Sequence, residues 1–198
     1  MENMSIDCVH TLGFLMRHVK PENTILDIGC GTGEVGYFLE RTGYDSVHNI
    51  DILDLREFET KRFELYNGVN IPFENCWFDI VILSFVLHHV PNEKKRLLLE
   101  EAVRVTKGKL FILEDTPRNP IDRLFSYLHG TGYRRKIKSN EWFGFYRQKR
   151  WEQIFRELGP KILVSQKLSR FCRHKGAPFA RSFFLLEKSE PLTQIPEN

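Results

Sequence analysis

The sequence predicts an α/β fold with a doubly wound, mostly parallel sheet. Residues 24–34, TILDIGCGTGE, read as a short buried strand, a glycine-rich turn and the start of a helix. Later apolar runs that suit buried parallel strands, such as residues 78–83, alternate with helical patterns such as residues 91–105. This alternation is typical of βαβ units, whose strands form one parallel sheet between helices.

Composition favours a single intracellular domain. The chain has 198 residues, 41% hydrophobic and 13% aromatic, which is enough to fill one core. It contains no apolar run of 18 residues and no basic N-terminal stretch before an apolar one, so neither a membrane span nor a secretory signal is expected. The scattered cysteines form no CxxC pair, which favours reduced thiols and a cytoplasmic location. We expect one domain over residues 1–190 and a disordered tail over residues 191–198.

The first helix is expected over residues 4–19, where apolar side chains recur at helical spacing. Ser5 or Asn3 could cap its N-terminus, and Pro21 lies beyond its end. Residues 34–41 form the second helix, directly after the glycine turn. The other expected elements are strands at 46–51 and 63–66, a short polar helix or loop at 56–62, a strand at 78–83, a helix at 91–105, a tight turn at Lys107–Gly108, a strand at 109–115, a short helix at 121–129, a helix at 148–158, and strands at 161–168 and 179–186.

The glycine turn predicts a nucleotide-like ligand. Gly29, Gly31 and Gly33 alternate, which differs from the GxGxxG dinucleotide fingerprint, but each glycine allows a positive φ and a close approach of a ligand to the backbone. Asp51 ends the second strand 18 residues beyond Gly33, where an acid can accept both ribose hydroxyls of an adenosine group. Asp54 is a rival for this role, but it is expected at the start of the next element.

Two longer strings make the pattern more specific. Residues 26–33 read LDIGCGTG, and residues 67–90 read NGVNIPFENCWFDIVILSFVLHHV. The first resembles motif I of the class I S-adenosylmethionine-dependent methyltransferases, especially the branch that acts on small molecules. The second resembles the family string DAExLPFxDxSFDxVxxxxxLHHV in order and spacing, and Asp51 is similar to the family's ribose-binding acid. The resemblance is strong over residues 22–115 and rests on topology elsewhere.

This resemblance implies both a fold and a cofactor. The family has a Rossmann-like, doubly wound seven-stranded sheet of order 3-2-1-4-5-7-6, with the last strand antiparallel and a lid inserted after strand 5, here at about residues 116–147. Its methyl donor, S-adenosyl-L-methionine, leaves as S-adenosyl-L-homocysteine. The glycine backbone lies against the methionine part, with Asp27 near the ammonium. Asn67 replaces an Asp that faces the adenine amino group in many relatives, and its carbonyl oxygen could accept that N–H. The implied cofactor-binding residues are Asp27, Gly29, Cys30, Gly31, Asp51, Ile52, Asn67, Gly68, Val69, Ser84 and Phe85.

The implied reaction is an in-line transfer of the methyl group to an oxygen or nitrogen nucleophile of a small molecule. A nucleophile that is protonated at neutral pH needs a base, and His88, His89 and Glu114 are the candidate catalytic residues. A structural role for the histidines and a capping role for Glu114 are the alternatives. No metal is expected, because the two adjacent histidines have no matching ligand set. The candidate substrate-binding residues are Asp115, Tyr127, His129, Tyr133 and Tyr146.

Charge is distributed unevenly along the chain. The net charge is +3, but residues 118–175 hold 15 Lys and Arg against 4 Asp and Glu. This basic section favours an anionic substrate, or an RNA or protein acceptor that docks on it, while a solvated surface is the plain alternative. The Asp/Asn/Ser-Pro-Pro-aromatic motif of enzymes that methylate base amines is absent after residue 83, so nucleic acid is not favoured. A non-enzymatic binding subunit is a further alternative, although the turn glycines and Asp51 are present.

Overall fold

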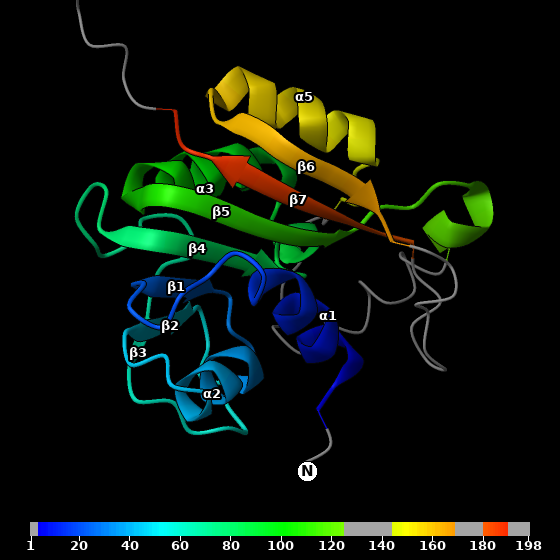
Figure 1. Cartoon of the computed structure of the whole chain (residues 1–198). Coiled ribbons are helices and arrows are strands. Elements are labelled where there is room, and N and C mark those ends of the chain that lie inside the picture. Colours follow the sequence, from blue (N-terminus) through cyan, green and yellow to red (C-terminus); the bar gives the residue numbers. More distant parts are fainter. Residues whose placement is uncertain (1–3, 125–143, 169–179, 190–198) are drawn as a thin grey trace, which may run out of the picture.

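The computed structural model describes residues 4–124, 144–168 and 180–189, and these residues form one seven-stranded sheet (Figure 1). The strands are β1 (Ile25–Ile28), β2 (Val47–Asp51), β3 (Phe63–Leu65), β4 (Phe78–Ser84), β5 (Thr106–Asp115), β6 (Lys161–Lys167) and β7 (Arg181–Glu187). Their spatial order is β3-β2-β1-β4-β5-β7-β6. Neighbouring strands from β3 to β5 are parallel, whereas β7 is antiparallel to both β5 and β6. The predicted fold class and strand order are therefore confirmed.

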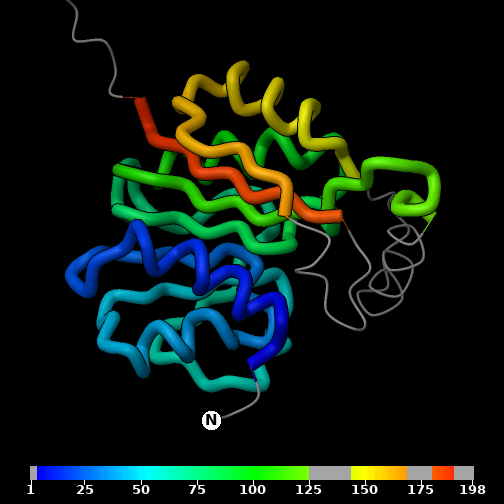
Figure 2. The backbone as a smooth tube through the Cα atoms, turned by 45° about the vertical axis from the view of Figure 1, so that its right-hand side comes forward, coloured from blue at the N-terminus to red at the C-terminus, as the bar shows by residue number. Residues whose placement is uncertain are grey.

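Helices cover both faces of the sheet. They are α1 (Ile6–Leu15), α2 (Glu34–Arg41), the 3-10 turn η1 (Leu87–His89), α3 (Asn92–Val105) and α5 (Gln148–Leu158). Helices α1 and α2 pack on one face, and α3 and α5 pack on the other (Figures 1 and 2). Strand β4 shows the division, because successive strand side chains point to opposite faces. Ile80 and Ile82 join the core under α1 and α2, whereas Val81 and Leu83 join the core under α3 and α5.

The carboxyl ends of the parallel strands meet at one edge of the sheet. The register of β1 with β2 and β4, and of β4 with β5, brings this edge together. It carries the glycine turn that follows Ile28, together with Asp51, Ser84 and the pair Glu114–Asp115. Ligands bind at the carboxyl ends of strands in open parallel sheets. The polar residues singled out in the sequence therefore gather at the edge where a ligand is expected.

The tight turn expected at Lys107–Gly108 is wrong. Strand β5 begins at Thr106, directly after α3, and both residues belong to the strand. A Cβ atom on Gly108 would lie 2.6 Å from the carbonyl oxygen of Asp79. The glycine is therefore present for the close approach of β4 and not for a turn.

One other boundary differs from the sequence prediction. Helix α1 ends at Leu15 rather than at residue 19, although Val19 is still buried in the core. Residues 56–62 form a loop, which is one of the two alternatives predicted for them. The predicted cap is confirmed, because the Ser5 side chain accepts a hydrogen bond from the Cys8 N–H at the start of α1.

The structure describes only the two ends of the insertion expected at residues 116–147. A helix begins at Pro120, where the Asn119 side chain accepts a hydrogen bond of 2.8 Å from the Asp122 N–H. Residues 125–143, which include most of the expected lid, lie outside the described residues, as does the expected tail. Within the described part of the chain, no helix is long and apolar enough to cross a membrane.

Candidate active site

The glycine turn has the backbone conformation of a ligand cradle. Gly29, Gly31 and Gly33 have φ angles of +70°, +54° and +78°, in the left-handed region that favours glycine. A Cβ atom on Gly29 would lie 2.6 Å from a methyl carbon of Val86. A Cβ atom on Gly31 would meet no protein atom within 4 Å. Gly31 thus faces open space, and a bound group can lie directly against its backbone.

Asp51 is bound to this turn. Its Oδ2 accepts a hydrogen bond of 2.8 Å from the Gly31 N–H, and its Oδ1 accepts one of 2.7 Å from the Ile52 N–H. A carboxylate has about four acceptor positions, so further hydrogen-bond donors can still be accommodated. Its rival Asp54 is instead engaged by Arg56 through two contacts of 2.9 Å. The geometry favours Asp51 over Asp54 as the ribose acceptor.

Changing Asp51 to alanine is expected to raise the dissociation constant for S-adenosylmethionine by about tenfold to a hundredfold, because charge-assisted hydrogen bonds are lost. Titration calorimetry measures this constant, and Asp54→Ala is the matched control with the same change of charge. A loss of affinity in the Asp54 variant alone would move the ribose role to Asp54.

Asp27 lies on β1, beneath the glycine turn, and its side chain is buried. Burial raises the pKa of its carboxyl group to about 7, and the nearby Asp51 carboxylate adds to the increase. A carboxylate in such a site favours a cationic partner, which would restore its ordinary acidity. Cys30 is also buried, and burial raises the pKa of its thiol, so the structure provides no thiolate nucleophile at this position.

The side chain of Asn67 is engaged within its own loop. Its Oδ1 accepts hydrogen bonds of 3.0 Å from the Val69 N–H and 2.7 Å from the Asn70 N–H. These two bonds occupy the carbonyl oxygen that we expected to accept the adenine amino group. Asn67 therefore shapes the loop that contains Gly68, which has a φ of +84°.

Strand β4 is followed directly by a strained residue. Phe85 has a φ of +57°, which is uncommon for a side chain of this size and typical of functional sites. Its N–H donates a hydrogen bond of 2.8 Å to the Leu113 carbonyl of β5. The hydroxyl of the preceding residue, Ser84, lies 2.6 Å from the Thr11 hydroxyl on α1. The end of β4 is thus held between β5 and the first helix.

His88 and Glu114 form a buried pair beside this edge. The His88 Nδ1 and Glu114 Oε2 atoms lie 2.9 Å apart, and the exposed fractions of the two side chains are 1% and 0%. The Leu87 N–H donates a hydrogen bond of 2.7 Å to Glu114 Oε1. Burial lowers the pKa of His88, but the charge and hydrogen bond of Glu114, together with the charge of Asp115, outweigh this effect, so the net shift is upward. His89 is half-buried, with its ring 4.0 Å from that of His88.

Asp115 is paired with a residue that the sequence reasoning missed. Its Oδ1 lies 3.2 Å from the Nε of Arg181. The Nη1 of the same arginine lies 2.7 Å from Asp7 Oδ1 and 3.3 Å from His10 Nδ1. The guanidinium group also lies 4.2 Å from the ring centroid of Phe85. The pairing of the last strands could have indicated this ion pair, because Asp115 and Arg181 lie opposite each other in the antiparallel pair of β5 and β7.

Helix α1 lies beside the site and is held by side chains at its N-terminus and in its middle. Both the N–H and the hydroxyl of Ser5 donate to the carboxylate of Glu34, the first residue of α2. Asp7 reaches Arg181 at the start of β7, and Thr11 reaches Ser84. This helix therefore closes one side of the space above the glycine turn.

The comparisons with known proteins agree with this geometry. Residues 4–164 match the family model described as a methyltransferase domain. The chain belongs to this family. The class predicted from the sequence, a class I S-adenosylmethionine-dependent methyltransferase, is thus confirmed, and with it the cofactor.

Named relatives of this methyltransferase include enzymes of quinone biosynthesis. The ubiquinone/menaquinone biosynthesis C-methyltransferase of Rickettsia prowazekii is 28% identical over 120 residues, covering 51% of this chain and 48% of the relative. The demethylmenaquinone methyltransferase of Thermotoga maritima is 32% identical over 114 residues, covering 53% of this chain and 48% of the relative. The matched segments thus span about half the length of these curated relatives.

Solved structures share the fold of this methyltransferase. A methyltransferase of Methanosarcina mazei superimposes with a TM-score of 0.68 at 21% identity, covering 88% of this chain and 96% of the other. The magnesium protoporphyrin IX methyltransferase of Synechocystis, with bound S-adenosylhomocysteine, superimposes with a TM-score of 0.66 at 15% identity, covering 92% and 82%.

The substrate-binding residues predicted for this methyltransferase are only partly described. Tyr146 packs against Trp151 of α5 at a ring distance of 4.9 Å and joins the core. Tyr127, His129 and Tyr133 lie outside the described residues. Among the described residues, no group of three or more His, Cys, Asp or Glu side chains could hold a metal ion.

Proposed function

We propose that this methyltransferase transfers a methyl group to an oxygen or nitrogen nucleophile of a small, anionic molecule, with His88 as the base. The buried His88–Glu114 pair at the carboxyl edge of the sheet is the observation that carries the proposal. Positioned bases of this kind remove the proton from a reacting hydroxyl or amine.

The residues at the glycine turn fit the cofactor. The open space at Gly31 would accommodate the methionine part, the buried carboxylate of Asp27 would pair with its ammonium, and Asp51 would accept hydrogen bonds from the ribose hydroxyls. Ile52 and Leu53 have exposed fractions of 41% and 38%, so they provide an apolar wall for the adenine. When bound, S-adenosylmethionine supplies an electrophilic methyl group. The remaining residues in our proposed cofactor site are Gly29, Cys30, Asn67, Gly68, Val69, Ser84 and Phe85.

Glu114 determines how His88 would act. A carboxylate beside Nδ1 holds the neutral imidazole as the Nδ1–H tautomer, which leaves Nε2 as the atom that takes a proton. The same carboxylate then stabilises the imidazolium that forms, as in triads that pair an acid with a histidine. His89 is the second candidate, because it is less buried than His88.

The named relatives extend the choice of acceptor atom. They are named as C-methyltransferases of quinone biosynthesis or as a demethylmenaquinone methyltransferase. Deprotonating a ring hydroxyl makes both the oxygen and the conjugated ring carbon nucleophilic, so one base can serve either outcome. Aromatic hydroxy acids are therefore the first acceptors to test, and their charge suits the basic section at residues 118–175.

Changing His88 to glutamine is expected to lower kcat by about a hundredfold or more, and Glu114→Gln by about tenfold or more, because the base and its orienting partner are lost. Transfer of labelled methyl groups to a panel of aromatic hydroxy acids and amines measures the rate. The dissociation constant of the cofactor should stay within about twofold of the wild-type value.

His48→Gln is the matched control, because this histidine lies on β2 against Phe73 and Phe78. If His88→Gln kept the full rate while His89→Gln lost it, the base would be His89. If neither variant lost activity, the proposal of a histidine base would be rejected.

The basic section supports a second candidate, an RNA or protein acceptor that docks on residues 118–175. Binding of a structured RNA with an affinity that falls steeply with salt would support the RNA form. Methylation of small acids with no detectable RNA binding would exclude it.

A further inference from the structure

Lys95 is an unusual residue for its position in α3. Its side chain lies among the buried residues of this helix, with Leu98, Leu99 and Ala102 at helical spacing, and its exposed fraction is only 1%. A buried ammonium group is costly unless it is paired or hydrogen-bonded. A lysine in an apolar stripe therefore indicates a specific set of partners.

The partners of Lys95 join two separate parts of the chain. Its Nζ donates hydrogen bonds of 2.7 Å to Asn92 Oδ1, in the same helix, and of 2.5 Å to the carbonyl oxygen of Gly144. The same atom lies 4.7 Å from the ring centroid of Tyr146, close enough for a cation–π interaction. Gly144 and Tyr146 belong to the segment that leads into α5. One ammonium group thus fixes this segment to α3.

The segment is shaped for this contact. A Cβ atom on Gly144 would lie 2.4 Å from Asn92 Oδ1, closer than real side chains approach. Only a glycine lets the segment come near enough for its carbonyl to reach Lys95 without displacing Asn92. The lysine, the asparagine and the glycine therefore form one fitted set.

The residue between the two Lys95 contacts packs on the proposed base. The ring of Phe145 stacks on the imidazole of His88, with a centroid distance of 5.0 Å and an interplanar angle of 19°. Lys95 therefore contacts Gly144 and Tyr146, the two neighbours of the residue that covers His88. A shift of this segment would move the ring against which His88 is packed.

The charges in this region also act on one another. Burial lowers the pKa of Lys95 to about 8, while the Glu114 and Glu93 carboxylates oppose that shift. The pKa of His88 is lowered by burial and by Lys95, and it is raised by Glu114 and Asp115, which together produce a net upward shift. Loss of the ammonium charge would therefore raise the pKa of His88.

We infer that Lys95 is a positioning residue, whose ammonium holds Gly144–Tyr146 in place so that Phe145 keeps the imidazole of His88 oriented. The catalytic consequence of this inference rests on the proposed role of His88 as the base. The contact between Lys95 and Gly144–Tyr146 does not depend on which acceptor is methylated. Lys95 acts through Phe145 and the local charge, and not by contact with the cofactor or the acceptor.

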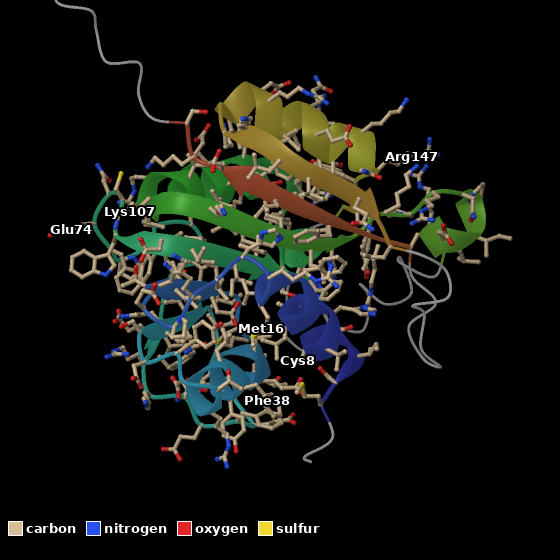
Figure 3. All side chains as sticks on the ribbon, viewed as in Figure 1. Cys8, Met16, Phe38, Glu74, Lys107 and Arg147 are labelled. Carbon is tan, nitrogen blue, oxygen red and sulfur yellow. The ribbon has the colours of Figure 1, made fainter. Side chains whose placement is uncertain are left out.

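The test is Lys95→Met in the full chain, compared with the wild type and with Lys107→Met. Lys107 is exposed and lies at the opposite end of the molecule from Arg147, the residue before α5 (Figure 3). Hydrogen exchange at residues 145–146 is expected to accelerate about tenfold or more, because a charge-assisted hydrogen bond is lost. An NMR titration should show the pKa of His88 shifted upward. The Lys107 variant should change neither quantity.

The catalytic readout is a fall in kcat of about tenfold with a cofactor dissociation constant within about twofold of wild type. Lys95→Arg keeps the charge and should restore much of the exchange protection. If Lys95→Met does not fold, Gly144→Ala tests the same contact with the lysine in place and should accelerate the same exchange.

Unchanged exchange and an unchanged His88 titration in Lys95→Met, or in Gly144→Ala where the first variant does not fold, would overturn the inference. These two measurements need no acceptor, so they also separate this inference from the proposed function. Faster exchange together with a fully active His88→Gln variant would reject the base and keep the anchoring role of Lys95.

Discussion

Replacing Gly31 by arginine is expected to abolish binding of S-adenosylmethionine, with affinity falling by at least about a hundredfold. Gly31 has a φ of +54°, and the space beyond its Cα is open for 4 Å. An arginine side chain would fill this space with positive charge, and it would meet the cationic methionine end of the cofactor. The Gly31 N–H that orients Asp51 would also be disturbed. Titration calorimetry with S-adenosylmethionine and S-adenosylhomocysteine measures the loss.

Gly43→Arg is the matched control for this substitution. Gly43 also has a positive φ, of +98°, and open space at its Cβ position, but it follows α2 on the surface. The two variants should therefore suffer similar backbone strain, and only Gly31→Arg should lose the cofactor. Normal cofactor binding by Gly31→Arg would show that the ligand does not lie against this turn.

Stability of the cofactor-free protein is expected to fall as the pH rises from about 4 to about 7, and Asp27→Asn should remove this part of the fall. The pKa of Asp27 is raised by burial from 3.8 to about 7, so the folded state keeps a proton that the unfolded state has already released. The stability that such a group contributes is fully present below its pKa in the unfolded state, and it is lost as the pH rises through its pKa in the folded state. The shift corresponds to about 4 kcal/mol of unfolding free energy. Urea unfolding at pH 5 and pH 8 measures the part lost above pH 5, which is about 3 kcal/mol.

Asp54→Asn is the control for the pH measurement. Hydrogen bonding to Arg56 holds the pKa of exposed Asp54 at about 2, so its contribution is lost only as the solution becomes more acidic than pH 4. The Asp27 variant should gain stability relative to wild type at pH 8. It should also bind the cofactor more weakly, because it lacks the carboxylate that we propose as the partner of the ammonium group. Equal stability differences at both pH values would show that Asp27 is not protonated in the folded protein.

The arrangement of layers could be predicted because it depends on patterns that repeat along the chain. The strands β1 and β4 are apolar except for Asp27, Asp79 and the terminal Ser84, and such strands are stable only when both faces are buried, so helices must lie above and below them. The glycines at 29, 31 and 33 are similarly informative, since their positive φ angles require this residue type locally. The ribose-binding role of Asp51 was predicted from its position at a strand end, and the strand order was predicted from the family resemblance.

Other features depend on neighbours that are distant in sequence. Gly108 looked like a turn residue, but the approach of Asp79 from β4 determines its role. Leu97 of α3 is an apolar residue with an exposed fraction of 47%, whereas the buried stripe of this helix contains Lys95. No local pattern predicts that such a lysine has a carbonyl partner 49 residues away.

The same division applies to the site itself. The residue types at strand ends and in the glycine turn predicted a nucleotide-like ligand, and the family resemblance of residues 26–33 and 67–90 identified this ligand as the methyl donor. The partners of the polar side chains were decided by the folded arrangement: Glu114 with His88, Arg181 with Asp115, and Lys95 with Gly144. The physical reason is that a buried charge must find a partner in space, and only the packed elements determine which groups lie within reach.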